Sequence, residues 1–158
     1  MDPFAVLGLP PTVELQPRDL EARYLALARE CHPDRHRNAD PDQQLAMLAR
    51  AAELNDAYRS LRDPWQRAEA LLELRAPGML QATKRLSPTF LGEALELAEE
   101  VAGASGDAAA ALRVRLDDQV REDFAAVGAA ITAGAFETAA VRVHQSRYHR
   151  KALEDLAR

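Results

Sequence analysis

Residues 24–34 read YLALARECHPD and residues 54–63 read LNDAYRSLRD, and these two stretches decide the fold. Each lies in a segment whose apolar side chains recur every three or four positions, as they do on one face of a helix. Pro33 disfavours the helical conformation in the residue before it, so we expect the first helix to stop there. The second helix is expected over about residues 42–61. The sequence therefore predicts two helices joined by a polar loop that begins with His32-Pro33-Asp34.

Capping residues and prolines mark further helix starts along the chain. A proline that follows Asp63 or Ser87 is typical of a first helical position after an N-cap. Asp107 is expected to cap a long helix, and Gly134 is expected to turn the chain before the last one. The predicted elements are a short apolar segment at 4–9 and helices at 17–32, 42–61, 65–74, 88–102, 107–133 and from 136 onwards.

These patterns predict an all-α chain in two parts. Residues 1–75 should form an antiparallel helical hairpin with two short flanking helices. Residues 76–86 should form a linker, because Ala76-Pro77-Gly78 breaks the helical pattern. Residues 87–158 should form a three-helix bundle. Valine and isoleucine are scarce in the chain, so strands are not expected.

Composition narrows the range of functions. The net charge is −5 and acidic residues outnumber basic ones in both halves, so nucleic acid is not an expected partner. No apolar run is long enough to span a bilayer. Met1-Asp2-Pro3 leads directly into the first apolar segment without a signal sequence, so we expect a cytoplasmic protein. The single cysteine, Cys31, excludes an internal disulfide.

Possible metal ligands gather near the loop, where Cys31, His32, Asp34 and His36 lie within six residues. Tetrahedral zinc sites normally use two separated pairs of ligands, and Cys31 falls on the apolar stripe of its helix. A metal-binding or redox protein that uses Cys31, His32 and His36 is therefore a minority alternative. No phosphate-binding or dinucleotide-binding motif is present. We predict no catalytic residues, no metal and no cofactor.

The tripeptide is better suited to contact with another protein. Pro33 fixes the backbone, which reduces the entropy lost on binding. Asp34 can accept charge-assisted hydrogen bonds, especially from an arginine, and His32 can both donate and accept. The alternative is a simple helix-stop turn in which Asp34 caps local backbone groups.

The flanks of the tripeptide resemble a J-domain. Tyr24 lies eight residues before His32, and the next helix carries Asn55, Ala57-Tyr58 and Leu61 in the J-domain pattern. The resemblance covers residues 1–75. It implies that the loop stimulates the ATPase of a DnaK-type chaperone, through these residues: His32, Pro33, Asp34, Tyr24, Arg23 and Arg29.

The whole chain resembles the HscB family of iron–sulfur cluster assembly co-chaperones. The similar stretches are MDPF at residues 1–4, FxxLGLP at 4–10 and LRDPxxRAExLL at 61–72, followed by the three-helix bundle. The resemblance implies a co-chaperone rather than an enzyme. Its bundle would bind an IscU-type cluster scaffold while its J-domain recruits an HscA-type chaperone. A J-domain protein with a different client is the alternative within the same class.

The predicted helix at 88–102 carries more apolar surface than one packed face needs. Phe90, Ala94, Leu97 and Val101 form one stripe, and Leu91, Leu95, Ala98 and Ala102 form a second beside it. The excess is either a binding strip or the sign of a helix buried between two neighbours. The resemblance favours the first, and it implies scaffold contacts at Leu91, Leu95, Glu96, Glu99 and Tyr148. Gly92 stands where a bulkier apolar residue is expected.

Overall fold

The computed structural model describes residues 1–157, with every side chain in that range except that of Pro33. The described residues form helices and no strand, which confirms the predicted all-α fold. The chain divides into two compact units, Met1–Leu74 and Arg75–Arg158. The elements are α1 (Pro3–Leu7), α2 (Pro17–Glu30), the 3-10 turn η1 (Pro33–Arg35), α3 (Pro41–Arg62), α4 (Pro64–Arg75), α5 (Met79–Ala82), α6 (Pro88–Gly103), α7 (Gly106–Thr132) and α8 (Phe136–Asp155).

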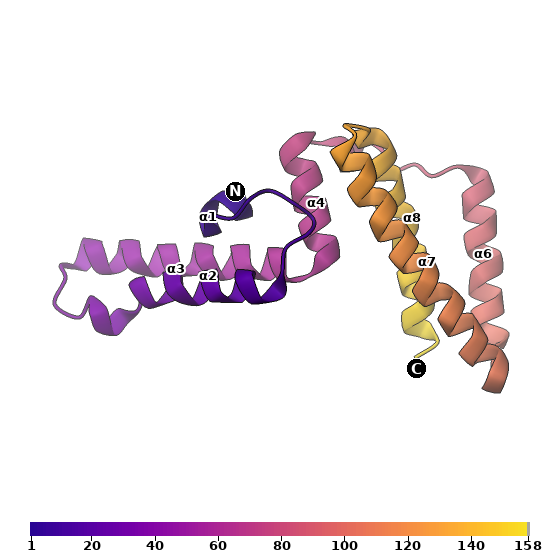
Figure 1. Cartoon of the computed structure of the whole chain (residues 1–158), viewed down its shortest axis with the longest axis horizontal. Coiled ribbons are helices and arrows are strands. Elements are labelled where there is room, and N and C mark those ends of the chain that lie inside the picture. The colour runs from indigo at the N-terminus through magenta and orange to yellow at the C-terminus, as the bar shows by residue number, and fades with distance from the viewer. Residues whose placement is uncertain (158) are drawn as a thin grey trace. The chain divides into compact units, whose positions relative to one another are not determined.

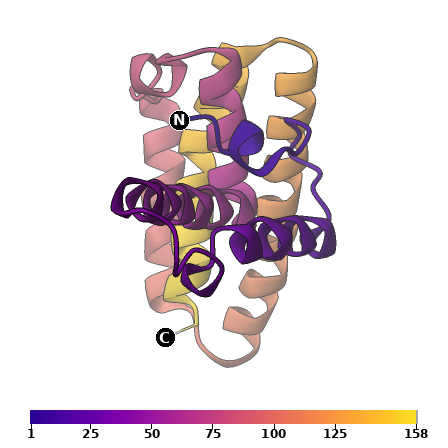
Figure 2. The same cartoon turned by 90° about the vertical axis from the view of Figure 1, so that its left-hand side faces the viewer.

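The centre of the first unit is the hairpin of α2 and α3, which lie side by side in both views (Figures 1 and 2). Helix α3 starts where Asp40 accepts a hydrogen bond from the backbone N–H of Gln43 at 2.9 Å. Leu20 of α2 and Leu54 and Leu61 of α3 are almost completely buried. Burial of side chains of this size contributes roughly 1.5–3 kcal/mol each, so apolar packing holds the hairpin together.

Helix α1 is held at its C-terminal end by arginines from the hairpin. Arg23 Nε donates a hydrogen bond to the Leu7 carbonyl at 2.8 Å, and Arg50 donates one to the Val6 carbonyl at 2.9 Å. Gly8 ends the helix with φ +63°, and a Cβ added there would lie 2.8 Å from an Arg23 guanidinium nitrogen. The positive φ favours glycine at this position, and a larger residue would also displace the end of the Arg23 side chain.

Arg67 of α4 fixes the connection between α1 and α2. Its side chain is buried, and it donates hydrogen bonds of 2.8 Å to the carbonyls of Val13 and Leu61. Burial lowers the pKa of the Arg67 guanidinium below its usual value, while the nearby Asp63 carboxylate opposes that shift. The charge-assisted hydrogen bonds offset the cost of burying the charge.

The second unit is built around α8, which packs against α7, α6 and α5. The chain reverses at each short connection, so α6, α7 and α8 run alternately up and down (Figure 1). Leu112 and Leu116 of α7 and Ala152 of α8 form a buried cluster. The half-buried side chains packed against this cluster are Leu97, Val101, Ala104, Leu153 and Leu156.

Two local features differ from the sequence analysis. The segment treated as a linker, 76–86, contains the one-turn helix α5, and His144 Nε2 of α8 donates to the Leu80 carbonyl at 2.8 Å. The prediction that Asp107 caps the long helix is wrong, because α7 begins at Gly106 with Ser105 as its N-cap residue. Asp107 lies instead in the first turn, where a carboxylate interacts favourably with the helix dipole.

Candidate functional site

The tripeptide lies on an exposed turn directly after α2. The side chains of His32 and Asp34 are 60% and 69% exposed. The Asp34 N–H donates to His32 Nδ1 at 3.3 Å, and the Arg35 N–H donates to the His32 carbonyl at 3.0 Å. Pro33 begins η1, and its side chain lies outside the described set. The turn therefore presents a histidine and a carboxylate together to solvent.

The Asp34 carboxylate is engaged by a side chain that the sequence analysis did not select. Its Oδ1 accepts a hydrogen bond from Arg37 at 3.0 Å, and Arg37 is itself 76% exposed. The carboxylate is thus bonded to another side chain of the same loop. The i, i+3 spacing of opposite charges was the available signal in the sequence, but in an irregular loop such spacing does not fix a contact.

The other residues expected at the chaperone contact have different surroundings. The Tyr24 hydroxyl donates to Asn55 Oδ1 at 2.6 Å, and its ring stacks on that of Tyr58 with centroids 4.3 Å apart. Tyr24 therefore fixes the position of α2 on α3. Arg23 holds α1, as described above, whereas Arg29 is exposed in the last turn of α2.

The residues of the metal alternative do not converge. Cys31 is buried, whereas His36 Nε2 donates to the Glu30 carbonyl at the end of α2, at 2.6 Å. Within residues 1–157, no group of three or more His, Cys, Asp and Glu side chains is placed to hold a metal ion. The histidine ring satisfies a helix-end carbonyl, which is a structural role.

An apolar pocket beside the tripeptide also escaped the sequence analysis. It has a volume of about 610 Å³, and Asp34 and Arg37 contribute to its lining. Leu45 and Leu48 of α3 line it as well, and they remain 67% and 65% exposed. The two leucines lie three positions apart but off the buried stripe of α3, so helical periodicity alone did not select them.

A second exposed surface runs along α6 in the other unit. Phe90 is buried, whereas Leu91 and Leu95 are 43% and 63% exposed. The remaining members of the second apolar stripe, Ala98 and Ala102, are exposed too. This finding contradicts burial between two neighbouring helices and leaves the stripe as an accessible apolar strip. Glu96, Glu99 and Tyr148 are exposed as well, and a Cβ at Gly92 would meet open space.

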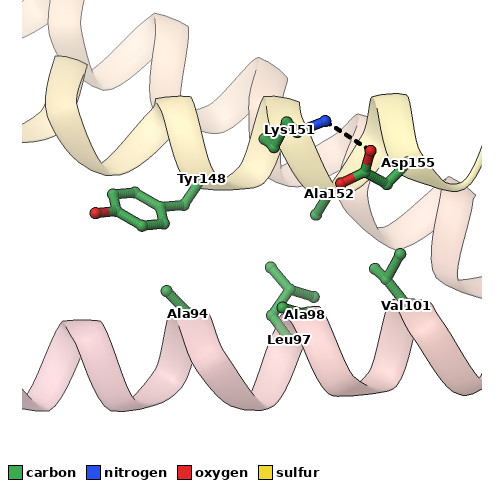
Figure 3. A pocket seen from close by; sticks show the side chains of 8 residues that line it. All are labelled: Ala94, Leu97, Ala98, Val101, Tyr148, Lys151, Ala152 and Asp155. Carbon is green, nitrogen blue, oxygen red and sulfur yellow. Dashed lines mark hydrogen bonds and ion pairs between the residues drawn. The ribbon is translucent and has the colours of Figure 1, made fainter.

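A groove separates α6 from α8 next to this strip (Figure 3). Its volume is about 120 Å³. The side chains that line it are Ala94, Leu97, Ala98, Val101, Tyr148, Lys151, Ala152 and Asp155. At one end Lys151 donates to Asp155 at 2.7 Å, and at the other the Tyr148 ring contacts Phe90 edge-on. Ala98 and Tyr148 thus belong both to the groove and to the exposed face.

The exposed turn and the apolar strip of α6 have the chemistry of protein-binding surfaces. Neither unit carries a helix of the length and apolarity needed to cross a membrane, within the residues that the structure describes.

Family comparisons match the two units separately and in order. Residues 2–70 match the model of the DnaJ domain, and residues 86–157 match the model of the HSCB C-terminal oligomerisation domain. The tripeptide lies in the first matched region, and the α6 strip with its groove lies in the second.

Similar proteins cover nearly the whole chain. A co-chaperone protein HscB homolog from Cupriavidus taiwanensis is 34% identical, over 98% of this chain and 90% of the relative. Another, from Burkholderia mallei, is 34% identical over 90% and 84%. The structure of chaperone HscB from Vibrio cholerae matches with a TM-score of 0.82 and 30% identity, over 99% of this chain and 96% of that one. The human co-chaperone HscB structure shares the fold, with a TM-score of 0.84 at 24% identity over 99% and 81%.

Proposed function

This chain belongs to the HscB family of J-domain co-chaperones, and from that premise we propose that it delivers an iron–sulfur cluster scaffold to a dedicated chaperone in the cytoplasm. The bundle binds an IscU-type scaffold, and the J-domain stimulates the ATPase of an HscA-type chaperone. ATP hydrolysis then traps the scaffold in a tight-binding state of the chaperone, so that its cluster can be transferred.

The observation that carries this proposal is the exposure of His32 and Asp34 on one turn. An exposed carboxylate is a suitable acceptor for a cationic group of the chaperone, and a bidentate arginine makes the strongest pair of this kind. Arg29, exposed in the preceding turn of α2, can add a second charged contact. Tyr24 and Arg23 stabilise the position of α2, because they bond to Asn55 of α3 and to the Leu7 carbonyl of α1.

The bundle supports the second half of the proposal. Leu91 and Leu95 of α6 and Tyr148 of α8 expose apolar surface. Glu96 and Glu99 are exposed on α6 as well. An apolar centre with a charged rim is the usual anatomy of a protein–protein interface. We propose that this face receives the scaffold.

The two surfaces reinforce each other because they belong to one chain. A scaffold bound to the bundle is held near the chaperone that the J-domain engages, and its second encounter becomes intramolecular. Effective concentrations for short tethers reach the millimolar range, so two weak contacts suffice for efficient delivery.

The test is a steady-state ATPase assay of an HscA-type chaperone with this protein, in the presence and absence of an IscU-type scaffold. We expect stimulation by the protein alone and a larger stimulation with scaffold. Asp34→Asn should abolish both. Asp56→Asn, which neutralises an exposed carboxylate of α3, should behave as wild type and serves as the matched control.

The outcomes separate the two halves of the proposal. Equal stimulation by Asp34→Asn would refute the role of the tripeptide. Stimulation without any added effect of scaffold would refute the scaffold role and favour a J-domain protein with a different client.

A further inference from the structure

Helices α6 and α8 leave a groove between them that their own side chains do not fill (Figure 3). Across the groove, Ala94 of α6 lies opposite Tyr148 of α8, and Ala98 lies opposite Ala152 (Figure 3). Alanine side chains are too small to fill the space between two helices that pack against each other, and the groove occupies that space.

An aromatic contact lies at one end of the groove. Phe90 of α6 lies edge-on to both Tyr148 and His149 of α8, with ring centroids 5.6 and 6.0 Å away. His149 is in turn fixed to α7, because its Nδ1 donates to Asp123 Oδ2 at 2.6 Å. Phe90 thus packs against a ring that is also bonded to α7, so this end of the groove is fixed in position.

The groove has the size and chemistry of a pocket for one side chain. A cavity of about 150 Å³ lined by apolar residues accommodates a benzene ring, so about 120 Å³ suits a leucine, isoleucine or valine side chain. Its walls are apolar along Leu97 and Val101. The Lys151–Asp155 pair lies at one end, where it can meet polar backbone groups of a bound segment.

We propose that this groove is the socket for one aliphatic side chain of the cluster scaffold, an inference that rests on the proposed function. The socket is continuous with the proposed scaffold face through Ala98 and Tyr148, and Leu95 is exposed three residues before Ala98. Anchor residues in desolvated pockets supply most of the energy of a typical interface. The scaffold segment therefore lies across α6, covers the exposed leucines and inserts its anchor between α6 and α8.

The test fills the socket without removing any contact outside it. Ala98→Leu occupies the groove with apolar atoms, and Ala98→Gln occupies it with a polar chain. Both changes are at an exposed helix position, where unfolding is not expected. Ala125→Leu, an exposed position of α7, is the matched control. Binding of the purified IscU-type scaffold is measured by isothermal titration calorimetry for the full chain.

We expect both Ala98 variants to bind the scaffold at least tenfold more weakly than wild type, with Ala125→Leu unchanged. The socket is refuted if either Ala98 variant binds as tightly as wild type while Leu95→Ala weakens binding, and the proposed function then stands. Absence of scaffold binding by the wild-type chain would instead refute the proposed function itself. Unchanged circular dichroism of the variants verifies that the comparison concerns binding.

Discussion

At the scale of single residues, the central carboxylate of the J-domain is already paired before any partner arrives. Asp34 accepts from Arg37 on the same loop, and both side chains are mostly exposed. Exposed ion pairs contribute about 0.2–1 kcal/mol, so a chaperone group can displace Arg37 at little cost. If a chaperone group binds Asp34 as proposed, Arg37 both holds the carboxylate in place and competes for it.

This competition predicts the effect of Arg37→Gln. Removal of the pair frees the Asp34 carboxylate, and the protein concentration needed for half-maximal ATPase stimulation should fall by at most about fivefold. Titration of the chaperone ATPase measures it, with Arg59→Gln, which removes the exposed pair with Asp56, as the control. A rise in that concentration would show instead that Arg37 contacts the chaperone directly.

Arg67 makes a prediction about stability. Arg67→Met should lower the free energy of unfolding by about 2–4 kcal/mol, because it leaves the buried carbonyl of Leu61 and the partly buried carbonyl of Val13 without their donor. Urea denaturation measures the change. Arg59→Met, on the exposed face of α3, should remain within about 0.5 kcal/mol of wild type. A loss at Arg67 as small as that of this control would mean that water replaces the guanidinium.

Single residues also show which side-chain contacts the sequence predicts and which it does not. The exposure of Leu91, Leu95 and Tyr148 agrees with the excess of apolar residues that the pattern of α6 indicated. Arg23, which the J-domain resemblance places at the chaperone contact, also bonds through its Nε to Leu7, 16 residues away, and the pattern gave no sign of this second role. Periodicity describes a helix face, but it does not tell which carbonyl of another element a long side chain will reach.

At the scale of elements, a buried pair joins the two long helices of the second unit. Asp123 of α7 is 2% exposed, and its carboxylate accepts from His149 of α8 and from Gln119 at 3.2 Å. A buried charge without its partner is strongly unfavourable. The pair therefore fixes the relative position of α7 and α8, and with it the aromatic contact at the end of the groove.

Removal of one member of the Asp123–His149 pair should lower the free energy of unfolding more than removal of both members. We expect His149→Leu to lower the free energy of unfolding by about 3 kcal/mol, since it strands the Asp123 carboxylate. The double variant Asp123→Leu/His149→Leu should recover most of that loss because no buried charge remains. Thermal and urea unfolding of the two variants measure both. If the double variant is less stable than the single one, the pair does not stabilise the unit mainly through its charges.

Element boundaries were predictable where the chain carries local signals. Helices α2 and α6 both begin with proline, and the sequence predicted both starts. At the start of α6, the Ser87 hydroxyl also accepts a hydrogen bond from the Phe90 N–H at 3.2 Å. Helix α5 has a single turn, too short for a periodic pattern, and a tertiary hydrogen bond from His144 supports it. Its position follows from packing that only the folded unit provides.

At the scale of the whole molecule, the proposed function depends on the two units being joined in one chain. Insertion of ten glycine and serine residues after Pro77 should leave stimulation without scaffold unchanged. The additional stimulation by scaffold should fall by less than about fivefold, because effective concentration declines slowly with tether length. The ATPase assay with and without scaffold measures both quantities. Complete loss of the scaffold effect, with both units folded, would show that delivery requires a fixed geometry.

The arginines that hold the N-terminal segment set an order of events during synthesis. The carbonyls of Val6 and Val13 are bonded by Arg50 and Arg67, which follow them by 44 and 54 residues. Residues 1–16 are therefore synthesised well before Arg67, and the Val13 carbonyl cannot reach its final contact until α4 has been made. At about 5–20 residues per second, this is a delay of several seconds. The connection between α1 and α2 thus becomes fixed only when α4 is in place.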